Sequence, residues 1–189
     1  MGAELPRRIV HASGAVIPLS YLLVGVPWNM VVAVFVIGAG VTAILEVVRL
    51  RVGLDWVVYD RLTREYEQEI VAGYAYYVVG GTVTVLLFSP EIAVPALFML
   101  MLVDPVSGWL GNSSPGGRKR FRVLVVTFVL SFMIAYPFTS VVPALAGGVV
   151  VALADGMKPV IAGRIIDDNL TIPIGGGTAM WLSELIVPL

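Results

Sequence analysis

The sequence predicts an all-α, polytopic integral membrane protein with six to seven transmembrane helices and a cytoplasmic N-terminus. The 189 residues are 58% hydrophobic and only 13% charged, whereas soluble domains average about 45–50% apolar and about 25% charged residues. Two long stretches, residues 12–45 and 123–154, carry no charge. The twelve basic residues all fall on one side of the topology that these stretches define.

This composition excludes several classes of protein. A disordered chain is poor in apolar residues, and a nucleic-acid-binding domain is strongly basic, whereas this chain has a formal net charge of −1. We therefore expect no nucleic-acid partner. The chain has no cysteine, which rules out a disulfide, a thiolate nucleophile and a cysteine-based metal site.

The individual spans follow from length and turn residues. A helix needs about 20 residues to cross a bilayer, so residues 12–45 predict two helices that turn at Pro27. Residues 123–154 predict two more, which turn between Pro137 and Pro143, and Pro90 separates the spans in between. We treat residues 1–189 as a single domain. Its spans are about 12–26, 29–48, 70–88, 92–103, 123–137 and 140–154, with 174–188 as the optional seventh.

The basic residues test this topology independently. They are Arg7, Arg8, Arg49, Arg51, Arg61, Arg64, Arg118, Lys119, Arg120, Arg122, Lys158 and Arg164. All of them fall on the side of the N-terminus, and the opposite turns contain none. Lys and Arg in short loops mark the cytoplasmic face. We therefore expect loops 49–69, 105–122 and 155–171 to be cytoplasmic, and the protein to lie in the cell membrane.

Residues 53–69 differ from the apolar spans. Apolar residues recur there at helical spacing with charged residues between them, a pattern that suits either an amphipathic helix in the membrane interface or a solvated connector. Tyr74, Tyr76 and Tyr77 then fall where an interfacial aromatic belt is expected. Within the spans, small residues suit close helix packing: Gly38, Gly40, Gly147 and Gly148.

Polar residues at the span ends are the candidates for function, because ionisable groups at membrane depth are costly. Glu46 ends the second span, and Arg49 follows one turn later. This pair is either functional or a helix-stabilising ion pair. The single histidine, His11, lies at the start of the first span and cannot form a histidine-based metal site alone. We interpret it as a polar residue at the interface.

A first cluster falls in one predicted cytoplasmic loop. Its members are Asp104, Ser107, Gly108, Gly111, Arg118, Lys119 and Arg120. Glycines let a backbone approach phosphate oxygens, Arg and Lys neutralise phosphate charge, and a carboxylate is a hard ligand for Mg²⁺. The alternative is a flexible glycine-rich loop whose basic residues only set the topology.

A second cluster lies in the next cytoplasmic loop. It comprises Asp155, Lys158, Arg164, Asp167, Asp168 and Asn169. Two loops that carry carboxylates and cations on one membrane face suit metal-assisted chemistry on a phosphorylated compound. Phosphoryl transfer requires mainly in-line positioning, Mg²⁺ and cations that take up developing charge.

In this order, the motifs resemble those of the dolichol kinase and phytol kinase (polyprenol kinase) family. Its Arg-Lys-x-x-His opening is similar to residues 7–11, and its Glu-x-x-Arg to residues 46–49. Arg64-Glu65, followed by Gly73-Tyr74 and Gly80, resembles the stretch that leads into the next helix of that family. Residues 104–111 are similar to its Asp-Pro-x-Ala-x-x-x-Gly, and residues 168–173 to its Asp-Asn-Leu-x-Ile-Pro.

The resemblance implies a membrane enzyme that uses CTP and Mg²⁺ to phosphorylate the hydroxyl of an isoprenoid alcohol. It assigns Asp104, Gly108 and Gly111 to a nucleotide loop, and Asp168 and Asn169 to the catalytic end. We expect Asp104 and Asp168 to bind Mg²⁺, assisted by Asp155 or Asp167. We expect the basic triplet, Arg118-Lys119-Arg120, and Lys158 to bind the phosphates. Further candidates are Arg8, His11, Glu46, Arg49, Arg64 and Glu65.

Two other functions stay open on the sequence. The family is distantly similar to phosphatidate cytidylyltransferases, so the same loops would also suit an enzyme that forms a CDP-activated lipid. The family's Lys-(Thr/Ser)-x-Glu-Gly-(Ser/Thr) sequence is replaced here by the basic triplet, which leads directly into Phe121. A catalytically inactive membrane scaffold or a small transporter is therefore the third alternative.

Overall fold

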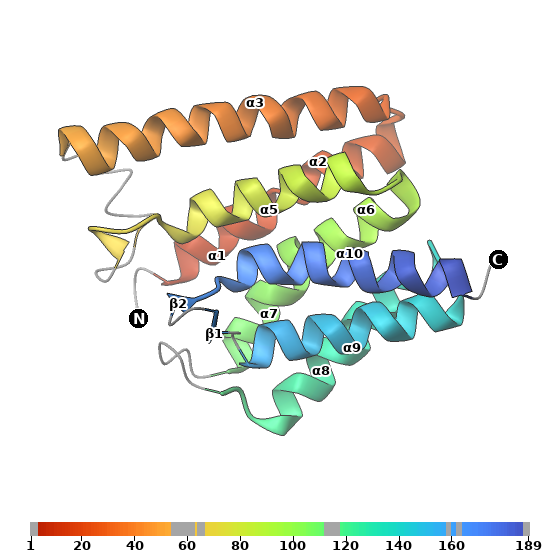
Figure 1. Cartoon of the computed structure of the whole chain (residues 1–189). Coiled ribbons are helices and arrows are strands. Elements are labelled where there is room, and N and C mark those ends of the chain that lie inside the picture. The colour runs from red at the N-terminus through yellow and green to blue at the C-terminus, as the bar shows by residue number, and fades with distance from the viewer. Residues whose placement is uncertain are drawn as a thin grey trace.

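Helices run back and forth between two ends of the molecule (Figure 1). This computed structural model describes residues 4–53, 63, 67–111, 118–157, 160–161 and 164–186. The α-helices are α1 (Glu4–Ser13), α2 (Val16–Leu19), α3 (Trp28–Val47), α5 (Gly73–Leu87), α6 (Pro90–Phe98), α7 (Asp104–Leu110), α8 (Phe121–Ala135), α9 (Val141–Met157) and α10 (Asp168–Ile186). The π-helical segments are η1 (Ser20–Val24), η2 (Val48–Val52) and η4 (Met99–Val103).

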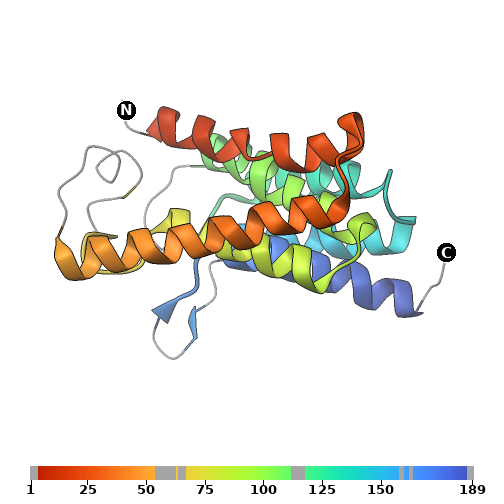
Figure 2. The same cartoon turned by 90° about the horizontal axis from the view of Figure 1, so that it is seen from above.

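The all-helical prediction is confirmed apart from one small hairpin. The strands β1 (Val160–Ile161) and β2 (Arg164–Ile165) pair antiparallel between α9 and α10. Both views place this hairpin and the N-terminus at one end of the molecule and the C-terminus at the other (Figures 1 and 2). We call the end that carries the hairpin the polar end.

Local backbone chemistry sets several helix boundaries. Gly25 and Gly53 end η1 and η2 in the left-handed conformation, with φ of 76° and 70°, which glycine adopts without a Cβ penalty. Pro27 precedes α3, and Pro90 is the first residue of α6, where a missing N–H costs no helical hydrogen bond. The predicted turns at Pro27 and Pro90 are therefore confirmed.

Among the residues that the structure describes, two continuous helices are long and apolar enough to cross a membrane, Trp28–Val52 and Pro90–Leu110. Their environments differ, since 22% of the apolar window of the first is buried and 67% of that of the second. Pro90–Leu110 is therefore the central helix of the bundle. Trp28–Val52 packs mainly along α5 and exposes residues such as Ile37 and Ile44, which are 67% and 66% exposed. An outward apolar face of this kind suits contact with lipid.

Several predicted boundaries are wrong. Residues 104–110, expected in a loop, form α7 and continue the fourth helical segment beyond residue 103. Pro105 stands in the first turn of α7, where proline is tolerated, and packing against α1 and α8 outweighs the low helix propensity of Gly108. The first helix starts at Glu4, and the last at Asp168. The six to seven crossings themselves stay a prediction.

Glycines in the interior permit the closest helix contacts. A Cβ on Gly147 would lie 2.7 Å from Met180 Cγ on α10, and one on Gly148 would lie 3.1 Å from Phe128 on α8. Close packing at these two positions is therefore confirmed. No atom of the described residues lies within 4 Å of the position that a Cβ on Gly40 would take, so within this part of the chain the same prediction is wrong for Gly40.

Candidate functional site

Three carboxylates from different helices meet at the polar end. Asp104 begins α7, Asp155 lies in the last turn of α9, and Asp168 begins α10. One oxygen from each lies within 4.8 Å of the others. We call these three residues the acidic cluster. Residues far apart in the sequence thus converge because α7, the end of α9 and the start of α10 lie at the same level of the bundle (Figure 1).

The Asp155 carboxylate is held by three donors. Ser107 Oγ and Lys119 Nζ donate to its two oxygens, and Thr127 Oγ1 on α8 donates to Oδ2 at 3.2 Å. Lys119 Nζ also donates to Ser107 Oγ at 2.8 Å. The side chain of Asp155 is 0% exposed and that of Lys119 is 9% exposed. A buried charge requires such pairing, and the network fixes one carboxylate of the acidic cluster rigidly.

The start of α10 has its own hydrogen bonds. Asp167 Oδ1 accepts the backbone N–H of Asn169 at 2.9 Å and the side-chain Nδ2 at 2.6 Å. This is the geometry of a helix N-cap, so Asp167 caps α10, and its predicted part in metal binding stays a prediction. The buried Asn169 Oδ1 has no hydrogen-bond partner within the described part of the chain, which leaves an acceptor next to Asp168 for a bound group.

The N-terminal helix α1 reaches the same region. His11 Nε2 lies 3.6 Å from Asp104 Oδ2, and the His11 ring contacts the edge of Tyr77 with centroids 4.3 Å apart. One turn earlier, the Arg8 guanidinium lies over Gly108, where a Cβ would be 3.6 Å from its terminal nitrogen. The interpretation of His11 as only an interfacial residue misses these contacts.

Glu46 and Arg49 form a separate, structural centre. Both Glu46 oxygens pair with the guanidinium, at 3.0 Å to Nε and 2.7 Å to a terminal nitrogen. The remaining Arg49 donors reach the backbone carbonyls of residues 67, 68 and 70 at 2.6–3.2 Å. Tyr74 OH donates to Glu46 as well. Of the two interpretations left open, these contacts support the stabilising ion pair.

The sequence does not predict the hydrogen bonds that Tyr74, Tyr77 and Thr127 make inside the bundle. Tyr74 and Tyr77 direct their hydroxyls to Glu46 Oε1 and to the His11 carbonyl, and their place in an interfacial aromatic belt stays a prediction. Thr127 is buried in α8 and bonds Asp155. A signal for it exists, because Thr127 and Ser131 are polar, lie four residues apart and share one face of an otherwise apolar helix.

The remaining candidates are spread around the acidic cluster. Arg118 and Arg120 are exposed just before α8, whereas Lys119 between them turns inward. Gly111 lies beside the Lys119 stem, where a Cβ would be in ordinary van der Waals contact with Lys119 Cδ at 3.5 Å. Three candidates, Arg64, Glu65 and Lys158, lie outside the described residues, as does most of segment 53–69.

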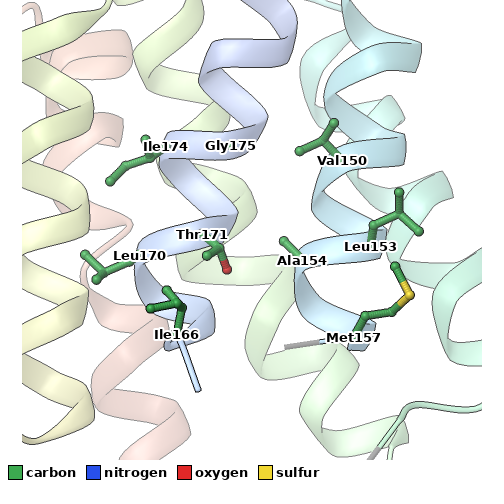
Figure 3. A pocket seen from close by; sticks show the side chains of 9 residues that line it. All are labelled: Val150, Leu153, Ala154, Met157, Ile166, Leu170, Thr171, Ile174 and Gly175. Carbon is green, nitrogen blue, oxygen red and sulfur yellow. The ribbon is translucent and has the colours of Figure 1, made fainter. Parts of the chain in front are cut away.

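An apolar groove runs between α9 and α10 (Figure 3). Its volume is about 620 Å³. The lining side chains are Val150, Leu153, Ala154, Met157, Ile166, Leu170, Thr171, Ile174 and Gly175. Ala154 directly precedes Asp155, and Leu170 follows Asp168 by two residues. The groove therefore includes the level of α9 and α10 at which Asp155 and Asp168 stand, although neither carboxylate lines it.

The donor set of the acidic cluster fits a hard divalent cation. Mg²⁺ binds oxygen at about 2.0–2.1 Å, so ligands on opposite sides of the ion lie about 4 Å apart. The cluster oxygens lie within 4.8 Å of one another, which is close to that separation. The unpartnered Asn169 oxygen adds a further oxygen donor next to Asp168.

Comparison with known proteins gives one informative relative. CTP-dependent diacylglycerol kinase 1 of Saccharomyces cerevisiae is 27% identical over an alignment of 207 residues, which covers 90% of this chain and 70% of the relative. No family model matches the chain, and no solved structure matches it. The chain is thus similar to a lipid kinase along nearly its whole length, whereas the narrower resemblance to polyprenol kinases stays a prediction.

Proposed function

We propose that the protein is a CTP-dependent lipid kinase that works at the cytoplasmic face of the cell membrane. The observation that carries the proposal is the convergence of Asp104, Asp155 and Asp168 within 4.8 Å, next to the buried Lys119. Ionisable residues at the end of an apolar bundle are costly and are therefore candidates for function. The similarity to a CTP-dependent diacylglycerol kinase names a reaction that suits them.

In the proposed reaction, the hydroxyl oxygen of the lipid attacks the γ-phosphorus of CTP. A new P–O bond forms, the bond to the β–γ bridging oxygen breaks, and CDP leaves. The hydroxyl proton passes to a carboxylate of the acidic cluster. Because phosphoryl transfer needs mostly positioning and charge neutralisation, no covalent intermediate with the protein is required.

The residues divide into three roles. Asp104 and Asp168, with Asp155, would hold Mg²⁺, which when bound would neutralise the charge of the nucleotide phosphates. Lys119 fixes Asp155 through their ion pair. The exposed Arg118 and Arg120, with Lys158, would contact the phosphates of the nucleotide.

The acceptor is proposed as a membrane lipid with a free hydroxyl. The groove between α9 and α10 supports this, because its apolar lining suits the hydrocarbon part of a lipid whose hydroxyl reaches the acidic cluster. The relative's name favours diacylglycerol, and the motif resemblance favours an isoprenoid alcohol. We place diacylglycerol first, since the similarity to its kinase covers 90% of the chain.

A screen of acceptors against nucleotides tests the proposal. Purified protein in mixed micelles would be incubated with Mg²⁺, either CTP or ATP, and either diacylglycerol or a polyprenol. We expect phosphatidate from CTP and diacylglycerol. Polyprenyl phosphate as the main product would correct the acceptor only. Absence of any phosphorylated lipid, with folding verified by a cooperative thermal transition, would refute the lipid kinase.

A further inference from the structure

The carbonyl of Leu100 lacks a helical donor. In an α-helix it would accept the N–H of Asp104, but that N–H donates to Met99 O, five residues back, because residues 99–103 are π-helical. In a π-helix the donor to Leu100 would come from residue 105, which is Pro105 and has no N–H. The step from η4 into α7 therefore leaves a fully buried residue with an open carbonyl.

His11 supplies the missing donor from another helix. Its Nε2 lies 2.9 Å from Leu100 O. A carbonyl can only accept, so Nε2 must carry the proton in this contact. Tyr77 holds the backbone of α1 in place, since its hydroxyl donates to the His11 carbonyl at 2.9 Å. The imidazole is thus fixed by contacts at its ring and at its main chain.

The position of this contact matters for the acidic cluster. A π-helical turn contains one residue more than an α-helical turn, and π-segments occur frequently at functional sites. If η4 returned to α-helical pairing, Asp104 would rotate by about 100° around the helix axis, the angle of one residue. Its carboxylate would then point away from Asp155 and Asp168.

We propose that His11 is a positioning residue for the acidic cluster. Its Nε2–H replaces the backbone donor that Pro105 removes from Leu100, and so holds the π-helical step that aims Asp104 at Asp155 and Asp168. The catalytic consequence rests on the proposed lipid kinase activity. The hydrogen bond itself does not, and the two are therefore tested separately.

The hydrogen bond is tested by spectroscopy. His11 is the one histidine in the chain, so protein labelled with ¹⁵N-histidine gives ring signals of this residue alone. In detergent we expect Nε2 to be protonated and its proton to exchange slowly with water. In Pro105→Ala the residue-105 N–H reaches Leu100 O, and we expect the Nε2 proton to exchange faster. An unprotonated Nε2 in the wild type would overturn the proposal, whatever the enzyme activity.

The positioning role is tested by kinetics in two backgrounds. His11→Leu removes the donor, and we expect kcat to fall about 10- to 100-fold with KM for CTP and lipid changed less than about twofold, as for other residues that orient a metal ligand. His11→Gln keeps an N–H near the same point and should restore most of kcat. In the Pro105→Ala background, His11→Leu should cost only a few-fold.

Two results would overturn the role. One is an equal loss from His11→Leu in both backgrounds, and the other is a loss carried by KM. If the wild type transfers no phosphoryl group at all, the proposed function fails, while the imidazole spectrum still decides whether His11 holds Leu100.

Discussion

At the residue scale, the buried Arg49 side chain has all of its N–H donors in hydrogen bonds. Its five N–H donors make five hydrogen bonds, two to Glu46 and three to backbone carbonyls between residues 67 and 70. The planar guanidinium suits this arrangement, which an ammonium group cannot reproduce. Arg49 therefore ties the start of η2 to the connection that leads into α5.

The first prediction concerns the stability that this side chain provides. We expect Arg49→Met to lower the free energy of unfolding by about 3–5 kcal/mol, because Glu46 would stay buried without its partner. Arg51→Met, two residues away and exposed, should change it by less than about 0.5 kcal/mol. Denaturant unfolding in mixed micelles measures both. Equal effects of the two substitutions would contradict the structural role of the ion pair.

The second prediction concerns Lys119 at the acidic cluster. We expect Lys119→Met to lower phosphoryl transfer about 10- to 100-fold, because Asp155 would lose its cation and repel Asp104 and Asp168. Arg122→Met is the matched control, since Arg122 is exposed three residues later. Initial rates at saturating CTP compare the two. A control that loses as much activity as Lys119→Met would refute a specific role of the lysine.

At the scale of the elements, the contact between α5 and α10 positions one carboxylate of the acidic cluster. Gly80 on α5 packs against the backbone carbonyl of Asn169, and a Cβ on Gly80 would overlap that oxygen. Asn169 is in the first turn of α10, directly after Asp168. Because Gly80 has no side chain, the start of α10 can pack directly against α5.

The third prediction compares two glycines in helix interiors. We expect Gly80→Ala to destabilise the protein by about 1–3 kcal/mol through overpacking. Gly40→Ala on α3 should stabilise it by about 0.5–1 kcal/mol, because space is open there and alanine favours the helix. Thermal unfolding of both variants in the same detergent checks the opposite signs. A stabilising Gly80→Ala would show that the α5–α10 contact is not tight.

The elements also show how far sequence patterns determine this structure. The charge-free stretches predict α3, α5, α8 and α9 because hydrophobic runs are a local property. They miss α7, since the local cost of Pro105 and Gly108 is offset by packing that the sequence does not display. The topology predicted from the basic residues puts Asp104, Asp155 and Asp168 on the same side of the membrane. Their convergence, and the Thr127 contact, depend on tertiary packing that no spacing rule provides.

At the scale of the whole molecule, the two ends differ in chemistry. The acidic cluster, the Glu46–Arg49 pair and the exposed Arg118 and Arg120 lie at the polar end (Figure 1). The opposite end carries the turns near Gly25, Ser89 and Thr139, without basic residues. This asymmetry matches the rule that basic residues mark the cytoplasmic side.

The fourth prediction tests this orientation. Because the chain has no cysteine, single-cysteine variants can be labelled without a background signal. Glu91 and Arg118 are exposed residues at opposite ends. In intact cells we expect a membrane-impermeant maleimide to label Glu91→Cys at once and Arg118→Cys only after permeabilisation. The reverse pattern would invert the proposed topology, and the cysteine-free parent is the control.

The central claim, transfer of the terminal phosphoryl group of CTP to a lipid hydroxyl, is tested most directly by the position of the label. Protein would be incubated with Mg²⁺, either diacylglycerol or phosphatidate, and CTP labelled at either the α- or the γ-phosphate, for the wild type and for Asp104→Asn and Asp168→Asn. We expect lipid label from γ-labelled CTP alone, and a strong loss in both variants. Label from α-labelled CTP, which marks cytidylyl transfer to a lipid phosphate, or full activity in both variants, would contradict the claim.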